Sequence, residues 1–524
     1  MSRRRKGHGC GITVLVLLFI FILAGGGLGV LFARKYMPSN ELADKSRIFG
    51  IKDGQVALIL DNQVQEEKGI YEGGQVYLPV DWVNEHLNQR FYWDEGEKLL
   101  VYALPDSIVY ADESAQGEKG PLFKVTQDGM YLSLGVVVNY TDIRTQAFAT
   151  SQIKRVFIDT SWQPYDTAVL KKTGQVRVKG GVKSQIITEA AAGETVDVLE
   201  TMDKWSRVRT ADGYIGYVEN RKLEAGEQIA PVSTFEAPVY TSISMDGKVR
   251  LGFHQVTRPE GNNTLESYVS NARGMNVIVP TWFNVVSGDG TYTSLASRDY
   301  VDKAHDMGLK VWAMVENVST EESVKNLNTK TLMSSTSTRK KLIEKLMNEA
   351  DTYGFDGFNL DFESLKAEAG PHYVQFIREM SVACRNKGLV LSVDNYVPSS
   401  YTAFYNRREQ GIVADYVIVM GYDEYYAGGE AGSVSSIPYV REGIENTLKE
   451  VPKEKVINAV PFYTRVWTVN EGKTSSKAYG ISDARQWVRR TRWSLAGISF
   501  WGSITVRLLA EADSSIYGWK RKIP

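Results

Sequence analysis

The strongest constraint on the fold is a regular alternation of short apolar runs with helical segments between about residue 236 and the C-terminus. Apolar runs such as Val277–Phe283 and Tyr416–Met420 are separated by helical stretches such as Ser337–Tyr353. Strand–helix alternation predicts a parallel sheet of the α/β class, and this many repeats predicts a (β/α)₈ TIM barrel. A doubly wound open sheet is the alternative. Its nucleotide-binding form is disfavoured because no Gly-x-Gly-x-x-Gly motif follows the first strand.

One predicted strand of this region carries acidic residues. In the segment Gly354–Glu363, Asn359, Asp361 and Glu363 share one face at a period of two. The apolar residues between them must meet the helices, so the polar face points into the barrel. Burial and mutual repulsion raise a carboxyl pKa there, so one acid can hold the proton that a glycosidic leaving oxygen requires. A structural acid pair that caps loops or meets an arginine is the alternative.

Two motifs in this region resemble a known enzyme family. The segment Asp356–Glu363 (Asp-Gly-Phe-Asn-Leu-Asp-Phe-Glu) resembles the Asp-x-x-Asp-x-Asp-x-Glu signature of glycoside hydrolase family 18. The segment Met420–Asp423 (Met-Gly-Tyr-Asp) resembles the motif on that family's sixth strand. The resemblance runs from about residue 248 to at least residue 468. It implies a TIM barrel with glycosidase activity and no metal or organic cofactor.

The resemblance also implies roles for the matching residues. Glu363 would be the general acid/base, and Asp361 would orient the acetamide group of the substrate. Tyr422 would hold the acetamide oxygen, while Asp423 would line the adjoining sugar site together with Asp356. The 2-acetamido oxygen of the substrate would be the nucleophile, which gives retention and requires an N-acetylated sugar at the cleavage site.

Aromatic residues near the C-terminal ends of other predicted strands are candidates for stacking on sugar rings. Ordinary packing at the rim of the barrel is the alternative for each. These residues are Trp282, Tyr396 and Tyr463.

Asn359 departs from the family pattern, which has an acid at this position. Its amide can hydrogen-bond Asp361 but cannot share a negative charge, so we expect a weaker proton shuttle or a shifted pH optimum. The Asn form resembles the branch that contains spore-cortex and cell-wall N-acetylglucosaminidases, which favours peptidoglycan over chitin as the glycan. A non-catalytic glycan-binding protein and a structural surface protein are the alternatives.

The N-terminal region predicts a membrane anchor. Residues 11–33 are uncharged and apolar, and they are long enough to cross a hydrocarbon layer of ~30 Å. The basic cluster Arg3–Lys6 places residues 1–10 inside the cell by the positive-inside rule. We therefore expect a single-pass protein of the cell membrane with an extracellular catalytic region. A cleaved signal peptide is the alternative, although its apolar core would normally be ~7–15 residues.

Two β-rich modules are predicted between a linker at 34–46 and the barrel at 236–524. Residues 47–160 resemble the stalk domain named after the copper amine oxidase N-terminus, and they contain a weak repeat between 74–83 and 128–137. Residues 170–226 resemble a bacterial SH3 domain, in which three aromatic residues form either a ligand platform or a small core: Trp205, Tyr214 and Tyr217.

Composition excludes several other classes. The chain has only two cysteines, which are too few for a fold held together by disulfides. Its five histidines are too few to favour a His-rich metal centre. Lys and Arg total 61 against 62 for Asp and Glu, which argues against a nucleic-acid partner.

The C-terminal tail fits the barrel pattern poorly. Leu495–Trp501 is the candidate eighth strand, with Trp501 as the candidate floor of the sugar pocket, but no convincing final helix follows it. When codons for the tail are read in a shifted frame, they can encode segments that the family branch usually carries there. We therefore hypothesise a frameshift near Val488, which leaves open whether the barrel is complete.

Overall fold

The computed structural model describes residues 37–318, 328–470, 473–490, 503–509 and 514–520 of the 524-residue chain. The chain divides into two compact units. The first contains the residues up to Phe91 together with Glu113–Ala237, and the second contains Tyr92–Asp112 together with the residues from Pro238 onward. The predicted anchor at 11–33 lies outside the described residues. Within them, no helix combines the length and the apolar character that crossing a membrane requires.

The first unit begins with a seven-stranded sheet in the order β11-β12-β1-β2-β3-β10-β9. The weak repeat predicted from the sequence corresponds to two similar strand–helix pairs, β3–α3 and β10–α4, whose strands pair antiparallel. The elements are α2 (Lys45–Phe49), β1 (Gln55–Leu60), β2 (Gln63–Glu72), β3 (Gln75–Pro79), α3 (Val80–His86), β7 (Gln116–Gly117), β8 (Gly120–Pro121), β9 (Phe123–Thr126), β10 (Gly129–Ser133), α4 (Leu134–Tyr140), β11 (Arg144–Phe148) and β12 (Arg155–Asp159).

The second sheet of this unit has the order β15-β14-β18-β17-β16-β13-β19 and encloses a small valine-rich core. Tyr214 is buried next to Phe49, with ring centroids 6.1 Å apart, so it is a core residue rather than part of a ligand platform. Trp205 and Tyr217 are half-buried. The strands are β13 (Tyr165–Leu170), β14 (Gly174–Arg177), β15 (Ile186–Ala190), β16 (Thr195–Thr201), β17 (Trp205–Arg209), β18 (Ile215–Glu219) and β19 (Leu223–Ile229).

The second unit is built on seven parallel strands in sequence order, which confirms the α/β class. A short strand, β22 (Tyr292–Ser294), pairs antiparallel with β21. The parallel strands are β20 (Leu251–His254), β21 (Val277–Val285), β23 (Lys310–Glu316), β24 (Gly357–Asp361), β25 (Val390–Tyr396), β26 (Tyr416–Met420) and β27 (Val456–Ala459).

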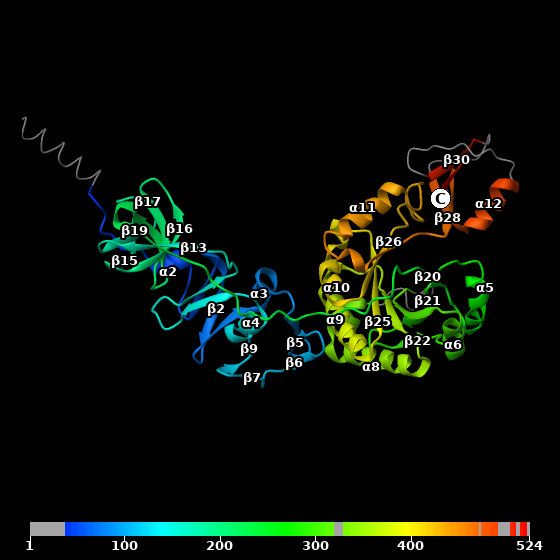
Figure 1. The fold of residues 1–524 in the computed structure, drawn as a ribbon, viewed down its shortest axis with the longest axis horizontal. Coiled ribbons are helices and arrows are strands. Elements are labelled where there is room, and N and C mark those ends of the chain that lie inside the picture. Colours follow the sequence, from blue (N-terminus) through cyan, green and yellow to red (C-terminus); the bar gives the residue numbers. More distant parts are fainter. Residues whose placement is uncertain (1–36, 319–327, 471–472, 491–502, 510–513, 521–524) are drawn as a thin grey trace, which may run out of the picture. The chain divides into compact units, whose positions relative to one another are not determined.

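Helices cover the outer face of this sheet, as α8, α9 and α10 show in Figure 1. Phe358, Leu360 and Phe362 pack in the large core cluster on that side, as the alternating pattern predicts. The opposite face carries a smaller cluster that includes Trp312 and Met314. The helices are α5 (Leu265–Val269), α6 (Arg298–Asp306), α7 (Thr329–Ser334), α8 (Thr336–Tyr353), α9 (Gly370–Lys387), α10 (Arg407–Val413), α11 (Ile437–Thr447) and α12 (Ile481–Arg490).

After β27 the chain changes to antiparallel pairing. The strands β28 (Tyr463–Asn470), β29 (Lys473–Gly480), β30 (Ser503–Leu509) and β31 (Ser514–Lys520) form a sheet in the order β29-β28-β31-β30. The predicted eighth strand and Trp501 lie outside the described residues. The described part of the chain thus contains seven parallel strands in sequence order, one fewer than the predicted (β/α)₈ barrel.

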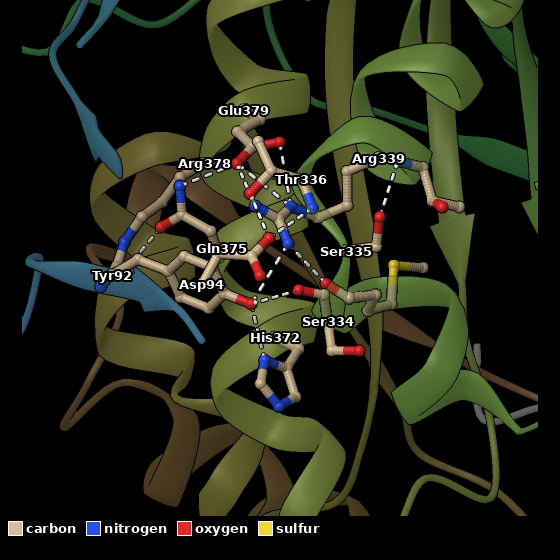
Figure 2. A network of polar contacts seen from close by, with 12 residues as sticks. Tyr92, Asp94, Ser334, Ser335, Thr336, Arg339, His372, Gln375, Arg378 and Glu379 are labelled. Carbon is tan, nitrogen blue, oxygen red and sulfur yellow. Dashed lines mark hydrogen bonds and ion pairs between the residues drawn. The ribbon is translucent and has the colours of Figure 1, made fainter. Parts of the chain in front are cut away.

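A segment from the predicted stalk module belongs to the barrel unit. Residues 92–112, assigned to the stalk by sequence, form the sheet β4 (Tyr92–Asp94), β5 (Leu99–Ala103) and β6 (Ile108–Ala111), which packs against the barrel helices. Figure 2 shows how polar side chains of β4 meet α8 and α9. Asp94 Oδ2 accepts hydrogen bonds from the main-chain N–H (2.7 Å) and the hydroxyl (2.6 Å) of Thr336.

The same network contains a fully buried ion pair. Arg339 contacts both carboxylate oxygens of Glu379, at 2.9 and 3.1 Å, and its Nη1 donates to the Tyr92 hydroxyl at 3.2 Å. The Tyr92 hydroxyl also lies 2.7 Å from His372 Nδ1. These contacts make residues 92–112 an integral part of the barrel unit, which corrects the predicted boundary of the stalk module.

Candidate active site

Polar side chains from four neighbouring strands lie in one row at the C-terminal edge of the parallel sheet. Asn284 on β21 is in register with Glu316 on β23, and Glu316 is in register with Asp361 on β24. On β24 and β25, Leu360 pairs with Val393, so the next residues, Asp361 and Asp394, are also neighbours. Adjacent strands lie ~4.8 Å apart. The row therefore brings three carboxyl groups side by side, and we call Glu316, Asp361 and Asp394 the carboxyl row.

Burial and mutual repulsion change the acidity of these groups. Burial, followed by the charges of Asp394, Glu363 and Glu316, raises the pKa of Asp361 well above its usual range. Burial also raises the pKa of Asp394 to about 7, although the hydrogen bond from Asn359 opposes this shift.

Glu316 behaves in the same way. Burial raises its pKa to about 7, the hydrogen bond from Asn284 opposes the shift, and the charge of Glu363 adds to it. Together these shifts favour the protonated form of the carboxyl row at a higher pH than is usual for carboxyl groups.

Asn359 lies one level below the row, and its side chain is fully buried. Its Nδ2 donates to Asp394 Oδ1 at 2.9 Å and to Ser392 Oγ at 3.0 Å. The hydrogen bond to Asp361 that the sequence predicted is not the one that forms. Asn359 and Asp361 are two residues apart along one strand, ~6.6 Å, whereas β25 is adjacent.

Glu363 follows β24 directly and is held through both its side chain and its main chain. The Tyr396 hydroxyl donates to Glu363 Oε2 at 2.9 Å. Asn317 Oδ1 accepts from the Glu363 N–H at 2.8 Å, while Asn317 Nδ2 donates to the Glu363 carbonyl at 2.9 Å. The next residue, Ser364, has a left-handed φ of 55°. These contacts fix the half-buried Glu363 carboxylate at the edge of the sheet.

Tyr422, Asp423 and Tyr463 form a second group. The Tyr463 hydroxyl donates to Asp423 Oδ1, and the rings of Tyr422 and Tyr463 meet edge to face with centroids 6.5 Å apart. Asp423 also lies 3.9 Å from Arg465 and has a φ of 57°. Burial and the charges of Asp394, Asp361 and Glu363 raise the pKa of Tyr422, so its hydroxyl stays protonated and can donate a hydrogen bond.

Two of the predicted substrate-binding residues lie away from this site. Asp356 precedes β24 and therefore lies at the opposite end of the strand from Glu363. There it accepts hydrogen bonds from His305 (2.7 Å), Lys310 (2.7 Å) and the main-chain N–H of Val311 (2.9 Å). The assignment of Asp356 to a sugar site is therefore wrong, because its carboxylate ties the start of β24 to its neighbours.

Trp282 is also a structural residue. Its side chain is 1% exposed, packs against Tyr300 with ring centroids 5.1 Å apart, and donates through Nε1 to Asn262 Oδ1 at 2.9 Å. It points to the helix side of the sheet and cannot stack on a sugar. Tyr396 and Tyr463 do lie at the site, but in the structure they act as hydrogen-bond donors to acids.

Sequence reasoning missed several residues of the site, among them Glu316, Asn317 and Asp394. Asp394 could have been predicted from the sequence, because Ser392, Asp394 and Tyr396 repeat on β25 the period-two polar pattern of β24. Glu316 and Asn317 directly follow the apolar run of β23, at the end where barrel enzymes place functional groups.

Comparison with known proteins identifies two parts of the chain. Residues 254–509 match the family model described as "Glycosyl hydrolases family 18". Residues 176–223 match the one described as "Bacterial dipeptidyl-peptidase Sh3 domain", which confirms the SH3-like module. The resemblance of 47–160 to a stalk domain and the frameshift near Val488 stay predictions.

Several proteins are similar to part of this chain. The "Uncharacterized glycosylase YvbX" of Bacillus subtilis (strain 168) is 28% identical over 177 residues, which are 32% of this chain and 51% of that protein. The "Cortical fragment-lytic enzyme" of the same organism is 29% identical over 161 residues, 29% of this chain and 37% of that protein. The chain thus spans about half or less of the length of these curated relatives.

A solved structure is similar as well. The "C-terminal domain of putative chitinase" from Desulfitobacterium hafniense DCB-2 has a TM-score of 0.47 at 18% identity. The match covers 52% of this chain and 87% of that chain.

Proposed function

Because residues 254–509 belong to glycoside hydrolase family 18, we propose that this protein is a glycosidase that cleaves β-1,4 bonds at N-acetylglucosamine. The proposed substrate is the glycan of peptidoglycan, with a chitin-like glycan as the other candidate. The observation that carries the proposal is Glu363, held by Tyr396 and Asn317 beside the carboxyl row at the C-terminal edge of the sheet.

In the proposed reaction, Glu363 protonates the glycosidic oxygen as the sugar leaves. Asp361 accepts the N–H of the 2-acetamido group, and the Tyr422 hydroxyl donates to its oxygen. The acetamide oxygen attacks the anomeric carbon as the glycosidic oxygen leaves, so the nucleophile comes from the substrate. Water, deprotonated by Glu363, then attacks the same carbon and displaces the acetamide oxygen, so that two inversions retain the configuration. Family 18 is a known exception to the scheme in which a second protein carboxylate is the nucleophile.

The remaining parts of the chain fit action at a cell surface. We propose that residues 11–33 anchor the protein in the cell membrane with the catalytic region outside. Peptidoglycan is the preferred substrate because the Asn359 form of the motif resembles wall-lytic enzymes, and because one relative is named "Cortical fragment-lytic enzyme". An SH3 domain on the same chain, at residues 176–223, is a candidate for holding the wall.

The test is digestion of peptidoglycan and of chitin oligomers by the purified region 38–524, with mass spectrometry of the fragments. We expect new N-acetylglucosamine reducing ends, more from peptidoglycan than from chitin, and none from a Glu363→Gln variant with an unchanged melting temperature. Binding to either glycan without any cleavage would contradict the proposal and favour a glycan-binding protein.

A further inference from the structure

The strand β24 carries one carboxylate fewer than the family pattern, because position 359 is an asparagine. The structure places another carboxylate directly against that amide. Asp394 Oδ1 accepts from Asn359 Nδ2 at 2.9 Å, and both side chains are almost completely buried. Ser392 Oγ lies 3.0 Å from the same Nδ2, so two contacts fix the direction of the amide.

Asp394 is also the neighbour of Asp361 across the pair of strands. The pairing of Leu360 with Val393 puts Asp361 and Asp394 at the same level of the sheet. The groups whose charge acts on Asp361 are all carboxylates: Asp394, Glu363 and Glu316. Two buried carboxyl groups on neighbouring strands cannot both ionise readily, so we expect the pair to share one proton near neutral pH.

We propose that Asp394 is a positioning residue. Its carboxyl group on β25 takes the place of the carboxyl group that the family pattern has on β24, at the position where this chain has Asn359. When the shared proton is on Asp394, Asp361 is ionised and can accept the N–H of the substrate's acetamide. Asn359 donates to Asp394 without competing for that proton. This inference rests on the proposed function, since it assigns a role within the same reaction.

The surroundings keep this proton available near neutral pH. Burial raises the pKa of Asp394 to about 7, while the Asn359 amide limits the rise. The carboxyl groups whose charges act on the pair are Glu316 and Glu363, and the phenols that interact electrostatically with it are Tyr373 and Tyr405, from the helix side of the sheet, and Tyr422. Burial raises the pKa of all three phenols, so they stay neutral and the carboxyl groups set the proton equilibrium.

The test moves the carboxylate between the two strands. The region 38–524 is prepared as wild type, as Asp394→Asn, as Asn359→Asp and as the exchange variant Asn359→Asp/Asp394→Asn. Values of kcat and KM on an N-acetylated glycan are measured across the pH range. We expect Asp394→Asn to lower kcat about tenfold or more and to shift the pH profile by about one unit, with little change in KM.

The exchange variant distinguishes the proposed role from a structural one. The amide oxygen introduced by Asp394→Asn could still accept the hydrogen bond from Asn359, so this substitution keeps the shape of the site. We expect the exchange to recover about tenfold in kcat over Asp394→Asn and to restore a profile like that of the wild type. An exchange variant no more active than Asp394→Asn would overturn the proposal.

Asp415 provides a matched control. It is a buried acid at the opposite end of the sheet, where it accepts main-chain N–H groups of Ile243 at 2.7 Å and Leu391 at 2.8 Å. Asp415→Asn should lower the melting temperature and leave the pH profile of kcat unchanged. An active wild type with an equally active Asp394→Asn would overturn only the role of Asp394, whereas a wild type that cleaves no glycan would overturn the proposed function with it.

Discussion

At the scale of single residues, the hydrogen bond from Tyr396 to Glu363 is the contact with the clearest consequence for the reaction. It joins the phenol to Oε2 of the proposed general acid at 2.9 Å. We expect Tyr396→Phe to lower kcat roughly tenfold with KM nearly unchanged, because one hydrogen bond to a charged group contributes ~1.5 kcal/mol. Steady-state kinetics on an N-acetylated oligosaccharide would check this. A variant with an altered KM and an unaltered kcat would instead indicate that Tyr396 contacts the sugar.

The carboxyl row also predicts how stability depends on pH. Glu316 has a pKa of about 7 in the folded protein, whereas an unfolded glutamate titrates near ~4.3. Between these values the folded state binds more protons, so this contribution to stability is complete below the lower value and is lost as the pH rises through about 7.

We therefore expect the melting temperature to change less between pH ~5 and pH ~7.5 in Glu316→Gln than in the wild type, because glutamine has no proton to lose. Thermal unfolding of the region 38–524 at a series of pH values is the measurement. Parallel profiles for the two proteins would show that Glu316 is ionised in the folded state, against this expectation.

The residues of the site show what a sequence can predict and what it cannot. The period-two pattern of β24 correctly separates Asp361 from Phe362, because the direction of side chains is a property of the strand itself. The partnership of Asn359 with Asp394 depends on the register between two strands, which the tertiary pairing determines. Asp356 belongs to the same motif but lies at the other end of the strand, so membership in a motif did not imply a place in the site.

At the scale of elements, the sheet β4–β6 is the clearest departure from the sequence-based division of the chain. Its alternating pattern predicts strands correctly, but the pattern carries no information about which core the strands join. The contacts with α8 and α9 decide this, and they depend on buried polar groups: Asp94 with Thr336, and Tyr92 with Arg339 (Figure 2).

The ion pair between Arg339 and Glu379 should be essential to this packing. Both side chains are fully buried, so Glu379→Gln leaves the Arg339 charge without its partner. We expect a loss of ~3–5 kcal/mol in the free energy of unfolding of the barrel unit, measured by urea denaturation. The exposed pair of Asp299 and Lys303, 2.7 Å apart on α6, is the control, and Lys303→Ala should leave the midpoint nearly unchanged. Equal effects of the two substitutions would contradict this reading of the network.

At the scale of the whole molecule, the sequence anticipated the order of modules but not where each ends. Local patterns predict strands, helices and a parallel sheet, and the SH3 match at residues 176–223 confirms one module within its predicted limits. Residues 92–112 belong to the barrel unit through long-range contacts, which local patterns do not predict. The contact between Asp94 and Thr336, for example, joins residues more than two hundred positions apart in the sequence.

In the proposed reaction, Glu363 cleaves the glycan with help from the substrate's own acetamide group. The most direct measurement is ¹H NMR of a fully N-acetylated oligosaccharide during cleavage by the region 38–524, recorded before the anomers of the product equilibrate. We expect new reducing ends to appear first as the β-anomer, and the Glu363→Gln variant to produce none. New ends that appear first as the α-anomer, or equal cleavage by the Glu363→Gln variant, would contradict it.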